Sequence, residues 1–139
     1  MSSLKTTLEG YALYKGREGH LGFLLHRITG LGTLLFLAIH ILDTSFVYFN
    51  PKLYMDAIQI YRSTLFGFGE IILVFCVLFH GANGLRIAFV DLFAPKFWAL
   101  SSARQAVRWT LAIALVLWLP AAAIMLHNLL VNNFGLFGG

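Results

Sequence analysis

The sequence has few of the residues on which soluble enzymes and metal clusters usually depend. Among its 139 residues there is one cysteine, and only 12% of the residues are charged. The lone Cys76 excludes an internal disulfide and a cluster of thiolate ligands, so we expect it to pack inside an apolar segment. The sequence also lacks a nucleophile–base pair, a phosphate-binding loop and a nucleotide fingerprint. Catalysis by this chain alone is therefore not expected.

Hydrophobic residues, in contrast, make up 59% of the sequence, and the mean hydropathy is +0.79. Runs of about twenty apolar residues are typical of transmembrane helices, and three such runs occur, at residues 21–48, 65–93 and 107–131. The polar residues 1–20 have no apolar core or cleavage site, so we expect a cytoplasmic segment and not a cleaved signal peptide. The sequence predicts an all-α, multi-pass membrane protein, with residues 1–139 forming one domain.

The net charge of +4 is distributed unevenly between the two sides of the predicted membrane. Eight of the ten basic residues lie before the first span or around the second loop, and two lie in the first loop. Because cytoplasmic segments are enriched in lysine and arginine, the bias predicts a cytoplasmic N-terminus and an external C-terminus. The bias requires no nucleic-acid partner. The eight residues are Lys5, Lys15, Arg17, Arg27, Arg86, Lys96, Arg104 and Arg108, and the two are Lys52 and Arg62.

The second predicted span has a single histidine, His80, near its middle. An ionisable side chain at that depth is costly unless it has a partner or a function. Gly84 lies one helical turn further on, on the same face, and leaves space for a bulky group to approach. Arg27 and Arg86 supply cations that suit the propionates of a haem. The pattern favours a haem with His80 as an axial ligand, and the alternative is a hydrogen bond from His80 to a neighbouring helix.

The first predicted span carries two histidines, His26 and His40, on one polar stripe that we expect to face the interior of the helix bundle. Fourteen residues separate them, which corresponds to about 21 Å along a helix axis. A second imidazole for a bis-histidine haem comes either from His40 or from another subunit. His40 alternatively hydrogen-bonds to Asp43. The other members of the stripe are Thr29, Gly30, Thr33 and Thr44.

Arg27 has two interpretations at the start of the first span. It either extends to lipid phosphate or lines a polar pocket for a quinone head or a haem propionate. Between the first two spans, Asn50-Pro51 predicts a turn, and residues 52–63 predict a short amphipathic helix on the outer surface. We expect Glu70 near the outer interface, where it forms a hydrogen bond or meets water.

Two motifs together resemble a known family. HRITG (residues 26–30) is followed one span later by H-x3-G-x-R-x4-D (residues 80–91). In this order and spacing they resemble the cytochrome b membrane-anchor subunit of succinate dehydrogenase. The segment HILDTSFVYFNPKLY (residues 40–54) is similar to the actinobacterial-type branch. The likeness covers the first two spans, the loop between them and the three-span layout.

The resemblance implies a subunit of a bacterial inner-membrane complex, in which a flavoprotein subunit oxidises succinate and an iron–sulfur subunit relays the electrons. Two small anchor chains then bind haem b and a quinone, menaquinone or ubiquinone. On this sequence His80 would be the axial ligand, with a histidine of the second anchor opposite. Arg27 would line the quinone pocket, and His26 would lie near a propionate or in that pocket. Gly84 and Arg86 complete the second motif.

Two positions leave the cofactors open. Many ubiquinone-reducing relatives have a serine where this sequence has Phe23, so the quinone is bound differently or is of another type. Two-haem relatives use a first-span histidine for a distal haem, a role that His40 would fill. Three rival functions also stay open: a fumarate reductase anchor running the reverse reaction, a haem-free scaffold and a small transporter component.

Overall fold

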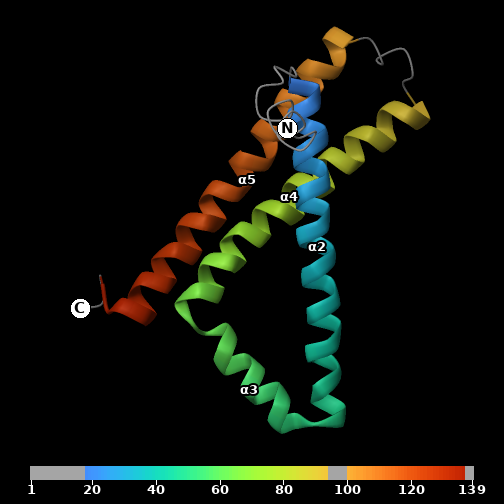
Figure 1. The fold of residues 1–139 in the computed structure, drawn as a ribbon. Coiled ribbons are helices and arrows are strands. Elements are labelled where there is room, and N and C mark those ends of the chain that lie inside the picture. Colours follow the sequence, from blue (N-terminus) through green and yellow to red (C-terminus); the bar gives the residue numbers. More distant parts are fainter. Residues whose placement is uncertain (1–17, 94–99, 137–139) are drawn as a thin grey trace, which may run out of the picture.

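The computed structural model describes residues 18–93 and 100–136 and forms a bundle of long helices (Figure 1). The helices are α2 (Glu18–Phe49), α3 (Pro51–Tyr61), α4 (Thr64–Phe93) and α5 (Leu100–Phe134). Three stretches of these helices are long and apolar enough to cross a membrane: His20–Phe49, Thr64–Phe93 and Arg104–Phe134. The prediction of an all-α protein is confirmed for the described residues, as is that of three helices long and apolar enough to span a membrane. The cytoplasmic segment predicted at residues 1–20 lies largely outside the described residues.

Helix α4 packs against both α5 and α2, whereas α2 and α5 touch each other over a smaller area. The buried side chains are few and gather where these helices meet, with Phe79 of α4 and Ala114 of α5 fully enclosed. Most other apolar side chains on the three long helices are exposed. An exposed apolar surface of this kind is suited to contact with lipid tails and with neighbouring transmembrane helices, because both are themselves apolar.

Glycines let α2 approach its neighbours closely along its first half. A Cβ on Gly22 would lie 2.8 Å from Val107 Cγ1, and one on Gly32 would lie 3.3 Å from Cys76 Sγ. Small residues at such crossings allow helix backbones to approach within van der Waals contact. Helices α2 and α4 cross and then diverge, and α3 closes the third side of a triangle (Figure 1). Residues 34–42 of α2 are accordingly all exposed.

The short helix α3 forms where the sequence predicts it. The Asn50 side chain accepts a hydrogen bond from the Leu53 backbone N–H at 3.3 Å, and Pro51 occupies the first turn. Both are favourable at a helix N-terminus, where backbone donors lack partners and proline has the required φ.

Helices α4 and α5 are joined by a hydrogen bond from a side chain. The indole N–H of Trp118 on α5 donates to the Ile71 carbonyl of α4 at 2.8 Å.

Candidate functional site

The central feature of the bundle is a pair of stacked histidines, His26 of α2 and His80 of α4. Their ring centroids are 4.1 Å apart, and their planes differ by only 4°. Both side chains are partly buried at the crossing of the two helices. The residues that begin the two sequence motifs are therefore in direct contact, although 54 positions separate them in the chain.

One hydrogen bond fixes the orientation of the His80 ring. Its Nδ1 lies 3.0 Å from the backbone carbonyl oxygen of His26. A carbonyl oxygen only accepts, so Nδ1 carries the hydrogen, and the neutral ring then has its lone pair on Nε2. Histidines that bind metals usually have this arrangement, with the other ring nitrogen donating to a carbonyl or carboxylate. His80 is thus prepared to donate an electron pair through Nε2.

Gly30 of α2 provides the space that the His80 ring occupies. A Cβ at this position would lie 2.6 Å from His80 Cε1 and 2.9 Å from Nδ1, closer than real Cβ atoms approach other atoms. Gly84, which the sequence placed beside His80, instead lies against His26, where a Cβ would meet Cε1 at an ordinary 3.8 Å. The glycine on which the His80 position depends is therefore on the facing helix.

Asn83 is a buried polar residue to which the sequence analysis gave no role. It is 1% exposed, and its Oδ1 accepts a hydrogen bond from Arg86 Nε at 3.0 Å. Residues three apart lie on the same face of a helix, so this spacing was the available signal. The bond holds the predicted Arg86 cation on the face of α4 that carries Asn83. Close by, His26 Nδ1 is buried and has no hydrogen-bond partner among the described residues.

Arg27 is not part of the stacked pair, because neighbouring residues point about 100° apart around a helix. Its side chain is exposed, and its guanidinium carbon lies 4.9 Å from the ring centroid of Phe23. Such a contact is a cation–π interaction. The residue that replaces the serine of many relatives therefore has a defined place in the structure, under the arginine of the HR motif.

His40 is exposed and stacks on Phe36 of the same helix, with ring centroids 5.3 Å apart. In the described part of the chain no hydrogen bond joins it to Asp43, whose Oδ2 is buried without a partner. Helix geometry places His40 about 21 Å along α2 from His26, and His26 touches His80. His40 and His80 of one chain are therefore too far apart to ligate the same metal ion.

The polar stripe predicted on the first span faces the bundle interior along only part of its length. Thr29 is buried, and Gly30 and Thr33 are partly covered by neighbouring helices. His40 and Thr44 are exposed because α2 has separated from α4 at that level. Their expected position in the interior of a larger anchor bundle, with a second chain present, stays a prediction.

Comparison with known proteins identifies the family of this chain. Residues 5–121 match the family described as succinate dehydrogenase/fumarate reductase transmembrane subunit. The chain is also 31% identical, over 115 residues, to a Mycobacterium tuberculosis protein named succinate dehydrogenase 2 membrane subunit SdhC. That alignment covers 81% of each protein. The matched region includes all of α2, α3 and α4, and hence both histidines of the stacked pair. The chain belongs to the succinate dehydrogenase/fumarate reductase transmembrane subunit family.

Proposed function

We propose that this chain is a haem b-binding anchor of succinate dehydrogenase, which helps to pass electrons from the iron–sulfur subunit to a membrane quinone. The observation that carries the proposal is the hydrogen bond from His80 Nδ1 to the His26 carbonyl. This hydrogen bond leaves Nε2 as an electron-pair donor on a side chain near the middle of α4, a helix long and apolar enough to cross a membrane. An ionisable side chain in that position requires a function or a partner.

The residues around His80 fit a haem. His80 would bind the iron, the His26 carbonyl holds its ring orientation, and Gly30 keeps its place free. Arg86, tied to Asn83, offers a cation for a propionate, and the unpartnered Nδ1 of His26 is a second polar atom available to it. When bound, the haem supplies a one-electron carrier whose potential depends on burial and on these hydrogen bonds.

For the quinone we propose a site at Arg27 and Phe23, near the start of the first span. The guanidinium has five N–H donors, which suit the carbonyl oxygen of a quinone head. Phe23 supplies a flat apolar surface beneath that guanidinium. In this proposal the Phe23 ring orients the Arg27 guanidinium, where many relatives have a serine hydroxyl. Arg27 then donates the hydrogen bond to the quinone.

Substitution of Arg27 tests this site. We expect Arg27→Gln to raise the KM for quinone about 10- to 150-fold, since a charge-assisted hydrogen bond contributes about 1.5–3 kcal/mol. Phe23→Leu should raise it only about two- to fivefold, because an exposed cation–π contact contributes about 0.5–1 kcal/mol. The measurement is succinate–quinone reductase activity of the purified complex. Lys52→Gln, an exposed cation on α3, is the matched control. An unchanged KM in Arg27→Gln would place the quinone elsewhere.

We further propose that His40 ligates a second, distal haem. No hydrogen bond joins His40 to Asp43 in the described part of the chain, and the imidazole lies on the exposed part of α2, where a second anchor chain can supply the opposite ligand. Haem in the purified complex should then measure two per copy, and His40→Ala should reduce it to one. One haem in the wild type, unaffected by His40→Ala, would restrict haem binding to His80. No haem in the wild type would leave a scaffold.

The orientation and the partners are part of the same proposal. Residues 34–42 of α2 present an apolar surface that a second anchor chain would cover, and the flavoprotein and iron–sulfur subunits would lie on the cytoplasmic side of a bacterial inner membrane. A membrane-impermeant maleimide should label Leu136→Cys but not Ser2→Cys in intact cells; the reverse pattern would invert the topology.

Comparing the rate of succinate oxidation with the rate of fumarate reduction by the complex tests the direction of the reaction against the fumarate reductase alternative.

A further inference from the structure

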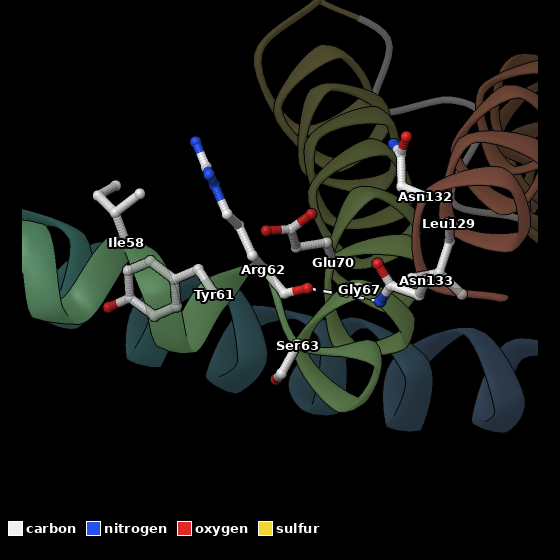
Figure 2. Close-up of a pocket in the computed structure, with 9 residues that line it drawn as sticks. All are labelled: Ile58, Tyr61, Arg62, Ser63, Gly67, Glu70, Leu129, Asn132 and Asn133. Atoms are coloured by element: carbon white, nitrogen blue, oxygen red, sulfur yellow. Dashed lines mark hydrogen bonds between the residues drawn. The ribbon is translucent and has the colours of Figure 1, made fainter. Parts of the chain in front are cut away.

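A groove of about 590 Å³ lies at the start of α4, where Gly67 and Glu70 line it, and nothing in the proposed electron transfer uses it. It is bounded by the end of α3, the start of α4 and the end of α5 (Figure 2). The side chains that matter here are Tyr61 and Arg62 from α3 and its following turn, Glu70 from α4, and Leu129, Asn132 and Asn133 from α5.

The walls of the groove are held together by contacts between the three helices. Asn133 Nδ2 donates to the Arg62 carbonyl at 3.4 Å (Figure 2). It also donates to Thr64 Oγ1 at 3.0 Å, so the end of α5 is tied to the turn between α3 and α4. Gly67 packs so closely on Leu129 that a Cβ would overlap Cδ1 of the leucine. The groove is therefore formed before anything binds in it.

Two opposite charges share this groove without neutralising each other. Arg62 and Glu70 are both exposed and both line it, and no ion pair joins them within the described ranges. Figure 2 shows the guanidinium and the carboxylate extending from different elements into the same space. A ligand with one negative and one positive group can satisfy both, whereas a simple anion would be repelled by Glu70. Asn132 adds a neutral donor and acceptor.

The location of the groove indicates what kind of molecule carries those charges. Glu70 is near the start of one membrane-spanning helix, and Asn132 is near the end of another, so the groove lies at the depth of lipid headgroups. Leu65 and Phe66 are exposed beside it on the first turn of α4, and Tyr61 packs edge-on against Phe66 with ring centroids 5.3 Å apart. Exposed apolar side chains next to the charged groove suit acyl chains.

We infer that the groove binds the headgroup of phosphatidylethanolamine. Its phosphate would meet Arg62, and its primary ammonium would meet Glu70. A primary ammonium has N–H groups that form charge-assisted hydrogen bonds with a carboxylate, which the quaternary ammonium of phosphatidylcholine lacks. Phosphatidylglycerol has the phosphate without the ammonium, so it would leave Glu70 unsatisfied. The chemistry of the two side chains selects one headgroup among three common types.

Lipid retention by the purified complex tests the inference. The delipidated complex is returned to nanodiscs with equal amounts of the three lipids, and the lipids retained after re-extraction are counted by native mass spectrometry. We expect phosphatidylethanolamine to be retained preferentially. Arg62→Gln should reduce its retention about tenfold, as for the loss of one charge-assisted hydrogen bond. Glu70→Gln should abolish the preference over phosphatidylglycerol. Lys52→Gln and Asp56→Asn alter exposed charges on α3 outside the groove. They should change neither the retention of phosphatidylethanolamine nor its preference over phosphatidylglycerol.

Haem content, which does not depend on this groove, shows whether each variant complex has assembled. Equal retention of the three lipids by the wild type would overturn the inference, as would equal retention by wild type and both groove variants. Loss of the second anchor chain from the groove variants, with lipid unchanged, would identify a protein contact instead. Displacement of the lipid by an equal concentration of soluble phosphoethanolamine would indicate a site for the free metabolite.

Discussion

Replacing His80 with alanine is expected to abolish the low-spin spectrum of the haem that we propose for this site, and to weaken retention of that haem about tenfold or more. The substitution removes the Nε2 atom that would donate its electron pair to the iron. The His26 carbonyl, which accepts the hydrogen bond from His80 Nδ1, then has no ring to orient. The measurement is haem per complex together with the visible and electron paramagnetic resonance spectra. A full haem complement with an unchanged spectrum would show that His80 is not the ligand.

The matched control is His26→Phe. It retains a flat ring against His80, as in the present stack with centroids 4.1 Å apart, and it retains the backbone carbonyl that holds His80 Nδ1. We therefore expect this variant to keep a low-spin haem, with a shifted midpoint potential because the polar Nδ1 of His26 is gone. Loss of haem in both variants would assign the imidazole of His26, and not only its carbonyl, to the cofactor site.

The helices of this protein could be predicted from the sequence because lipid leaves few alternatives. Each span must satisfy its backbone hydrogen bonds internally, so apolar runs of sufficient length become helices wherever they occur. The three predicted runs, 21–48, 65–93 and 107–131, lie inside α2 (Glu18–Phe49), α4 (Thr64–Phe93) and α5 (Leu100–Phe134) respectively. The cap at Asn50 and Pro51 is equally local, which explains why α3 was also predicted.

The details of the site depend on where helices cross, which no local pattern specifies. Periodicity placed Gly84 beside His80 on α4, but the close contact comes from Gly30 across the α2–α4 crossing. The same crossing explains the stripe on α2, which is covered as far as Thr33 and exposed at His40. A helical stripe indicates which residues share a face, while the length over which that face is covered follows from the angle between helices.

The contact between Phe23 and Arg27 was missed for a related reason. By itself, Phe23 in place of a serine indicates a different quinone contact and not a contact with Arg27. Residues four apart lie above one another on a helix, so the phenylalanine ring reaches the guanidinium, whose carbon lies 4.9 Å from the ring centroid. The i, i+4 spacing was the available signal. The groove at Arg62 and Glu70 had no comparable signal, because its walls come from three helices.

Replacing Gly30 with alanine is expected to disturb the haem site although residue 30 has no group that could bind iron. The new methyl would lie 2.6 Å from His80 Cε1, and the ring can relieve this contact only by moving away from the His26 carbonyl that it now bonds at 3.0 Å. Losing the partner that orients a metal-binding histidine typically weakens metal binding about 10- to 100-fold. We expect weaker haem retention and a shifted midpoint potential in Gly30→Ala, and larger effects in Gly30→Val.

Two other glycines of the bundle supply controls for this experiment. A Cβ at Gly69 or Gly81 of α4 would meet no atom within 4 Å, although Gly81 directly follows His80 in sequence. Gly69→Ala and Gly81→Ala make the same chemical change in a helix and should leave the haem spectrum and potential as in the wild type. If Gly30→Ala behaves like these two, the His80 ring is not held between α2 and α4 as the structure shows. A disturbance confined to Gly30 variants would make the α2–α4 crossing, and not His80 alone, the determinant of the haem site.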